Sequence, residues 1–187
     1  MKCRMIIIAA PSGAGKSSFV EKITSEILRL RDTVTYTTRA MRAGESEGVP
    51  YHFVSLEKFN ELREKGFFVE YANVHENWYG TPMHQLEEAW ARNEVIIMDV
   101  DVQGADTFKR NFPDAITIFI LPPSVDELRR RVIKRDGKVP DDLEIRMHNA
   151  ELEIKRCEDF DVQLVNDDFG KSYQEFKKIV EELLSRA

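Results

Sequence analysis

The stretch IIIAAPSGAGKSS, residues 6–18, runs an apolar segment into a loop of small residues that closes on a lysine and two serines. Residues 10–17 match the phosphate-loop pattern G-x-x-x-x-G-K-[S/T], except that Ala10 replaces the first glycine. A strand before the loop and a helix after it are the context that this pattern requires, and alanine is tolerated where φ is negative. We therefore predict that the loop holds a nucleoside triphosphate rather than forming a simple glycine–serine turn.

The chemistry of the loop explains its composition. Glycines let successive backbone N–H groups point at one anion, and the positive end of the following helix adds to the attraction. Lys16 is expected to reach the β- and γ-phosphates, and the Ser17 hydroxyl is expected to ligate Mg²⁺. The residues expected to bind the nucleoside triphosphate here are Ser12, Gly13, Ala14, Gly15, Lys16, Ser17 and Ser18.

The composition of the chain indicates its class and narrows its partners. With 187 residues, of which 42% are apolar and 32% charged, the chain is typical of one globular domain. The formal net charge of −6 argues against a nucleic-acid polymer as partner, because such binding needs many lysine and arginine contacts. The first apolar run is too short to span a bilayer, and no signal-cleavage pattern follows it, so we expect cytoplasmic localisation. Cys3, Cys157 and the four histidines lack the spacing of a metal site.

Along the chain, short apolar runs alternate with stretches of helical periodicity. This alternation predicts an α/β fold of the P-loop NTPase type, with a parallel sheet flanked by helices. Strands buried on both faces are expected at residues 5–10, 94–100, 115–121 and 162–166. Helices are expected at residues 16–31, 125–135, 141–156 and 171–186.

Two segments depart from this rhythm. Residues 34–81 alternate threonines, aromatics and glycines, which predicts an inserted β-rich lobe of short antiparallel strands with one helix at residues 56–65. The polar stretch KRDGKVPDD, residues 134–142, predicts a mobile loop between two helices, which could serve as a lid.

A phosphate loop does not identify the group that receives the phosphate, because switches, motors and kinases share it. The β-rich segment supplies candidates for a second substrate site. Arg39 and Arg42 with tyrosine hydroxyls would suit a dianionic phosphate, since arginine binds phosphate through paired N–H groups. Glu70, within the apolar run FFVEYA, could accept from two N–H donors on a purine edge. The full set is Thr35, Thr38, Arg39, Arg42, Tyr51, Glu70, Tyr79 and Thr81.

The motifs APSGAGKSS, TTRAMRAGE, YHFVS, VEYANVHENWYGT, IIMDVDVQGA, FILPPS and VNDD, in this order and spacing, resemble the guanylate kinase family, whose members move a phosphate from ATP to GMP. The resemblance runs from about residue 5 to the end of the chain. It implies a single domain, residues 1–187, with a core at about 1–33, 82–133 and 157–187, a GMP-binding lobe at about 34–81 and a mobile helical lid at about 134–156. It also implies Mg²⁺ as cofactor and ATP and GMP as small-molecule substrates, and it leaves dGMP and homo-oligomerisation open.

The resemblance also assigns roles to residues. The GMP phosphate would be held by Arg39, Arg42, Tyr51 and Tyr79, and guanine by Thr35, Glu70, Thr81 and Asp101. The residues that would act in catalysis are Lys16, Arg39, Arg42, Arg131, Arg135 and Arg146. Asn166 matches a residue near the adenine, and Asp99 is expected to join Ser17 as a metal ligand. Asp99 and Asp101 are two apart on a strand and therefore project to the same face.

Some features depart from the family pattern, and two other functions stay open. Proline is common in the family at the positions of Met41 and Ala43, and Pro82 after Thr81 is unusual. The first alternative is a non-catalytic guanylate-kinase-like binding module, which an intact phosphate loop disfavours. The second is a kinase of the same fold for another phosphorylated acceptor, such as a sugar bisphosphate, which the carboxylate of Glu70 disfavours.

Overall fold

The computed structural model describes residues 4–42, 44–74 and 76–185, so Cys3 and Ala43 lie outside the described residues. A five-stranded parallel sheet in the order β2–β7–β1–β8–β9 forms its centre. Its strands are β1 (Met5–Ala9), β2 (Leu30–Arg31), β7 (Val95–Val100), β8 (Ile116–Leu121) and β9 (Val162–Val165). The predicted parallel α/β fold is confirmed.

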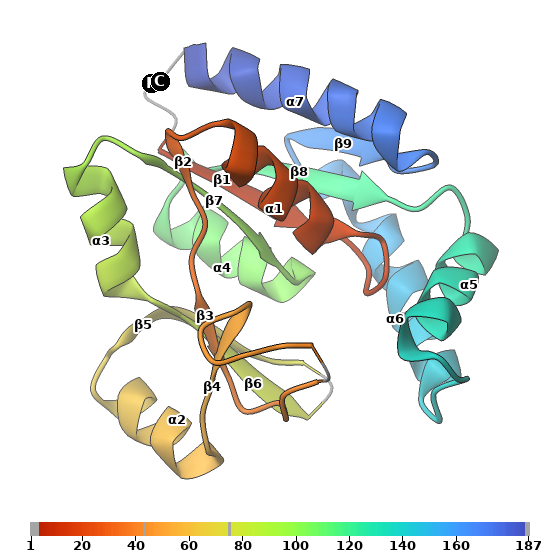
Figure 1. Cartoon of the computed structure of the whole chain (residues 1–187), viewed down its shortest axis with the longest axis horizontal. Coiled ribbons are helices and arrows are strands. Elements are labelled where there is room, and N and C mark those ends of the chain that lie inside the picture. Colours follow the sequence, from red (N-terminus) through yellow and green to blue (C-terminus); the bar gives the residue numbers. More distant parts are fainter. Residues whose placement is uncertain (1–3, 43, 75, 186–187) are drawn as a thin grey trace.

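Helices cover both faces of this sheet, as Figure 1 shows. On one side lie α1 and α7, on the other α3 and α4, while α5 and α6 stand beyond the ends of the strands. Their bounds are α1 (Lys16–Glu26), α3 (Met83–Ala91), α4 (Val102–Asn111), α5 (Val125–Asp136), α6 (Leu143–Lys155) and α7 (Phe169–Ser185), with a short 3₁₀ helix η1 (Cys157–Asp159) before β9.

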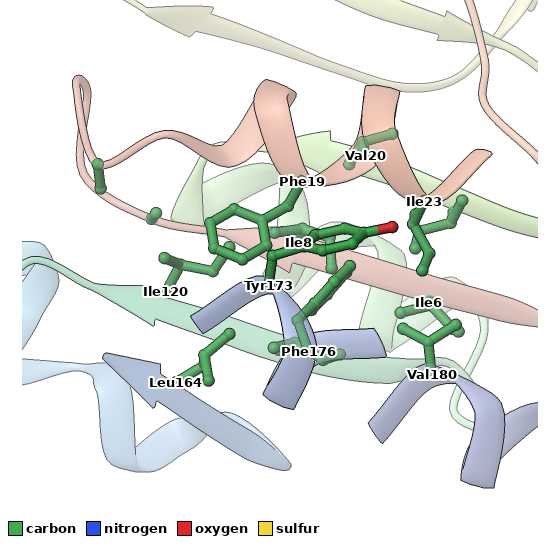
Figure 2. Packing of buried hydrophobic residues seen from close by; sticks show 14 of the residues in the cluster. Ile6, Ile8, Phe19, Val20, Ile23, Ile120, Leu164, Tyr173, Phe176 and Val180 are labelled. Atoms are coloured by element: carbon green, nitrogen blue, oxygen red, sulfur yellow. The ribbon is translucent and has the colours of Figure 1, made fainter. Parts of the chain in front are cut away.

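The alternation of β1 side chains between two cores explains why every residue of that strand is buried. Ile6 and Ile8 pack against α1 and α7, where the rings of Phe19 and Phe176 lie 5.1 Å apart between centroids (Figure 2). Ile7, on the opposite face, packs against α3 and α4. A strand covered on both faces needs such a continuous apolar run, and that run made β1 predictable.

Two expectations about the central layer are wrong, and two of its helices were not expected. The helix predicted for residues 16–31 ends at Glu26, because Ile27 turns to an extended conformation and Leu30 pairs with Val95 in β2. The strand at residues 162–166 is not buried on both faces, because β9 lies at the sheet edge and Val165 is exposed. Helices α3 and α4 had not been predicted.

A smaller sheet, ordered β4–β3–β6–β5, forms the lower part of the molecule in Figure 1. Its elements are β3 (Thr35–Thr37), β4 (Tyr51–Phe53), β5 (Phe68–Val74) and β6 (Asn77–Pro82), with helix α2 (Leu56–Glu64) between β4 and β5. Strands β3 and β4 pair in parallel, so the expectation of antiparallel strands throughout is wrong for this pair. Residue alternation predicts a strand but carries no information on the direction of its partner.

The connection between α5 and α6 occupies residues 137–142. Gly137 ends α5 with φ of 69°, a left-handed conformation that glycine adopts without strain. The helix predicted for residues 125–135 is confirmed and extends to Asp136, so the connecting loop is shorter than the expected residues 134–142. Among the described residues, no helix is long and apolar enough to cross a membrane.

Candidate active site

A cleft of about 540 Å³ lies between the carboxyl ends of the central strands, the smaller sheet, and α5 with α6. Ligands of open α/β sheets bind at this edge, outside the carboxyl ends of the strands. The predicted site residues that line the cleft are Ser12, Gly13, Gly15, Lys16, Ser17, Ser18, Thr35, Arg39, Arg42, Tyr51, Glu70, Tyr79, Thr81, Asp99, Asp101, Arg131, Arg135 and Arg146. Ala14 and Asn166 are buried and do not belong to its lining.

The loop between β1 and α1 has the backbone that a phosphate loop needs. Gly13 and Gly15 have φ of 93° and 99°, in the region that residues with side chains rarely adopt. A Cβ on Gly13 would also lie 2.7 Å from Cγ2 of Val132, so α5 packs directly on the loop. Ala10 is not among the described residues with positive φ, which explains why it can replace the first glycine. Lys16 Nζ folds back over the loop and donates to the Ala10 carbonyl at 2.7 Å.

Two oxygen groups meet where β1 and β7 lie side by side. The Ser17 hydroxyl, in the first turn of α1, donates to Oδ2 of Asp99 at 2.9 Å. Asp99 is carried there by the parallel pairing that sets it opposite Ile8. A hydroxyl and a carboxylate are hard oxygen donors of the kind that Mg²⁺ takes, usually in small number beside phosphate and water ligands.

Asn166 braces the phosphate loop from behind. It is 4% exposed, and its Nδ2 donates to the Ala14 carbonyl at 2.8 Å. The backbone carbonyl of Asn166 accepts from Arg131 Nη2 at 3.0 Å, so the arginine is bound to the same segment. The Asn166 Oδ1 atom has no hydrogen-bond partner among the described residues. This brace was not predicted, since the sequence indicated only a position near the adenine.

The far wall of the cleft holds a buried carboxylate. Glu70, on β5, is 6% exposed, and Thr81 Oγ1 on β6 donates to its Oε2 at a long 3.4 Å. Burial, together with the negative charge of Asp101, raises the pKa of Glu70 to about 8. Asp101 caps α4, where its Oδ1 accepts from the Gly104 amide at 2.8 Å. The wall can therefore offer hydrogen-bond acceptors to a ligand edge that carries N–H groups.

A cationic cluster lies beside this wall. Arg39 stacks 5.4 Å above the ring centroid of Tyr51, and the Tyr51 and Tyr79 rings meet edge to face at 5.8 Å. Arg39 Nη2 donates to Oε1 of Glu45 at 2.8 Å. The pKa of Tyr51 is raised, chiefly by burial and further by the charge of Asp99, so its hydroxyl remains a donor at neutral pH. Arg42 lines the same part of the cleft.

The opposite wall, formed by α5 and α6, carries the remaining arginines. Arg135 Nε donates to Asp136 Oδ1 at 2.8 Å, which lowers the pKa of Asp136. Arg146 Nε donates to Asp142 Oδ2 at 2.8 Å, and its Nη1 lies 3.6 Å from Asp136. These arginines thus reach the cleft from both sides of the 137–142 connection.

Several residues of the cleft were missed by the sequence analysis, among them Glu45, Val74, Asn77, Asp142 and Glu153. Glu153 follows Arg146 by two helical turns, so the spacing on α6 could have placed both on one face. Burial raises the pKa of its carboxyl. Glu45 is the last residue of the motif TTRAMRAGE, but no role was assigned to it, because a glutamate in a glycine-containing loop resembles a surface residue.

A phosphate loop and a separate arginine–tyrosine cluster in one cleft are typical of a phosphate-loop kinase, because a kinase binds a second substrate beside its nucleoside triphosphate and this cluster suits a phosphorylated one. Comparison with known proteins identifies which kinase. The family model for guanylate kinase matches residues 2–183. The guanylate kinase of Bdellovibrio bacteriovorus is 61% identical over 99% of this chain and 100% of its own length.

More distant relatives agree. The guanylate kinase of Syntrophotalea carbinolica is 42% identical over 94% of this chain and 84% of its own. The crystal structure of guanylate kinase from Anaplasma phagocytophilum superposes with a TM-score of 0.78 at 31% identity, covering 95% of this chain and 84% of that one. The chain therefore belongs to the guanylate kinase family, and the predicted activity, phosphate transfer from ATP to GMP, is confirmed.

Proposed function

We propose that the cleft performs this transfer by holding GMP against the smaller sheet and ATP against the phosphate loop. The observation that carries the proposal is the buried carboxylate of Glu70, which lines the same cleft as the Ser17–Asp99 pair. Guanine presents N1–H and an exocyclic amine on one edge, and an ionised Glu70 can accept from both. Adenine lacks both donors on that edge, so AMP would leave the buried carboxylate unpaired.

The phosphate of GMP would lie against Arg39, Arg42, Tyr51 and Tyr79. Two guanidinium groups and two phenolic hydroxyls supply enough donors for the three peripheral oxygens of a phosphate. Thr35, Thr81 and Asp101 would complete the guanine contacts. In this arrangement the smaller sheet, within about residues 34–81, acts as the GMP-binding lobe, and dGMP would fit the same contacts to base and phosphate.

ATP would bind with its β- and γ-phosphates over the loop. Backbone N–H groups at residues 12–18 and the ammonium of Lys16 would hold the phosphates, and Asn166 would keep the loop in shape from behind while lying near the adenine. Ser17 and Asp99 would hold Mg²⁺ through their adjacent oxygens. When bound there, the ion supplies charge neutralisation for the β- and γ-phosphates.

The reaction then depends on position and charge. An ionised phosphate oxygen of GMP is a nucleophile near neutral pH, so the chain needs no general base. Lys16, Arg39 and Arg42 would hold the two phosphates in line, and the arginines of α5 and α6, Arg131, Arg135 and Arg146, would neutralise the charge of the transferring group. Residues of about 134–156 would act as a lid that closes to exclude water, because water would otherwise accept the phosphate.

The test measures ADP release from ATP with GMP, dGMP, AMP, UMP, CMP or no acceptor, each with and without Mg²⁺. We expect rapid release with GMP and Mg²⁺ only, apart from slower release with dGMP. Lys16→Ala should abolish release, whereas Lys22→Ala, on the same helix but outside the cleft lining, should leave it near the wild-type rate. Equal rates with GMP and AMP would refute the role of Glu70, and release that does not depend on Mg²⁺ would refute the metal site.

A further inference from the structure

Glu45 binds two arginines of the cleft at once. Its Oε1 accepts from Arg39 Nη2 at 2.8 Å, and its Oε2 accepts from the backbone N–H of Arg42 at 2.7 Å. The Glu45 N–H in turn donates to the Arg42 carbonyl at 3.2 Å. One carboxylate therefore joins the side chain of the first arginine to the backbone of the second.

This ion pair is more enclosed than a typical surface pair. The side chains of Arg39 and Glu45 are only 12% and 17% exposed. The hydrogen bond from Arg39 lowers the pKa of Glu45, so its carboxylate is charged at neutral pH. Arg39 is fixed further by its Nη1, which donates to the Ala40 carbonyl at 2.7 Å, and by the aromatic rings beneath it.

Two roles are conceivable for an anion in this place, and they predict opposite effects. Glu45 could occupy the position of the substrate phosphate and have to leave when GMP binds, in which case its removal would strengthen GMP binding. Alternatively, it could remain and hold Arg39 in the orientation that the phosphate needs. The contact with the Arg42 amide favours the second role, because that backbone group lies outside the side-chain set that would bind the phosphate.

We propose that Glu45 is a positioning residue for the phosphate of GMP, which it serves by orienting Arg39 and fixing the loop that carries Arg42. The proposal rests on the proposed phosphate site at these arginines. A free arginine side chain loses considerable rotamer freedom when it binds an anion, and an arginine already held by Glu45 has lost much of it before GMP arrives. The negative charge of Glu45 also repels the phosphate, so Glu45 favours GMP binding by orienting Arg39 and not by its charge.

The experiment compares Glu45→Ala and Glu45→Gln with Glu47→Gln, measuring the KM for GMP and for ATP. Glu47 is a matched control, since it is a carboxylate two residues further on that contacts His52 and the Phe53 amide outside the cleft lining. We expect Glu45→Ala to raise the KM for GMP about tenfold, because this factor corresponds to the entropy lost when one long side chain is ordered. The KM for ATP should stay within twofold of the wild-type value. Glu45→Gln keeps one acceptor oxygen, so its KM for GMP should lie between those of the wild type and Glu45→Ala. Glu47→Gln should have the wild-type KM for GMP.

A double-mutant cycle with Arg39→Ala separates the possible outcomes. If Glu45 acts through Arg39, Glu45→Ala should raise the KM for GMP less in the Arg39→Ala background, where only its contact with the Arg42 amide remains, and an equal effect in both backgrounds overturns the proposal. A lower KM in Glu45→Ala also overturns it, in favour of a displaced placeholder. If Arg39→Ala weakens GMP binding but Glu45→Ala matches Glu47→Gln, only the role of Glu45 is wrong. If Arg39→Ala leaves the KM for GMP unchanged, the proposed phosphate site itself fails.

Discussion

Replacing Glu70 with glutamine should stabilise the folded chain at pH 8 while it removes activity toward GMP. The pKa of this carboxyl is raised from 4.5 to about 8, because burial and the charge of Asp101 disfavour its ionised form. A group whose folded pKa exceeds its unfolded pKa contributes stability that is present below the unfolded pKa and is lost as pH rises through the folded pKa. Wild-type stability should therefore fall between about pH 4.5 and pH 8.

The size of this loss follows from the pKa values. A rise from 4.5 to about 8 corresponds to roughly 5 kcal/mol of stability lost across that interval. Glutamine avoids the buried charge but brings an amide whose donors lack partners, at a cost of about 1–3 kcal/mol. The remaining gain of roughly 2–4 kcal/mol would raise the Tm by about 4–16 °C at pH 8 for a chain of this size. At pH 4 the gain should vanish and Glu70→Gln should be the less stable form.

GMP kinetics supply the second half of the test. Glutamine can accept only one of the two donors of guanine and turns its own amide toward the other, so kcat/KM for GMP should fall about a hundredfold or more. In the wild type only the ionised fraction of Glu70 binds guanine, so the KM for GMP should fall about fivefold from pH 7 to pH 8, and Glu70→Gln should lose this dependence. Thermal unfolding at both pH values and initial rates measure these effects. Unchanged GMP kinetics, or a Tm at pH 8 no higher than that of the wild type, would refute the reasoning.

Three further substitutions test other parts of the cleft. Asp99→Asn should raise the Mg²⁺ concentration for half-maximal rate by at least about tenfold, because one of the two proposed Mg²⁺ ligands is lost, and a Mg²⁺ titration checks this. Asn166→Ala should raise the KM for ATP and lower the Tm, since the buried Ala14 carbonyl loses its donor at a cost of about 1–3 kcal/mol; an unchanged KM for ATP would count against the brace. Gly104→Ala places a Cβ 3.3 Å from Glu70 Oε1, so it should raise the KM for GMP and leave that for ATP unchanged in steady-state assays.

The central sheet was predictable because its signal is local. The apolar runs of β1, β7 and β8 are buried on nearly their whole length, and this pattern is visible in the sequence. Strand β2 could not be found in this way, because it is only two residues long and exists through its pairing with β7. Helix α4 buries Val102, Ala105 and Phe108 at three-residue spacing, so its helical periodicity is present in the sequence and was overlooked because it begins directly after the strand β7.

The candidate site was predictable to the extent that its residues belong to recognisable motifs. The phosphate loop and Asp99 were placed by motif and strand position, and the contact between Ser17 and Asp99 agrees with that placement. Glu45 and Asn166 show what was missing. Glu45 binds the backbone N–H of Arg42 across a turn, and Asn166 binds the Ala14 carbonyl, which lies far away in the sequence. Such contacts depend on the folded structure, and the sequence motifs do not reveal them.

The ion pairs of the cleft explain how a chain with a net charge of −6 can bind two polyanions. Among the described residues, five arginines line the cleft, and four of them pair with a neighbouring carboxylate, namely Arg39, Arg131, Arg135 and Arg146. The enclosed Arg39–Glu45 pair is suited to fixing an orientation, whereas Arg135 is 39% exposed beside Asp136. Exposed pairs of this kind contribute about 0–1 kcal/mol, so exchanging a carboxylate for a phosphate costs little. In the proposed arrangement Arg39 would therefore be oriented before GMP binds, whereas Arg135 could exchange Asp136 for a phosphate.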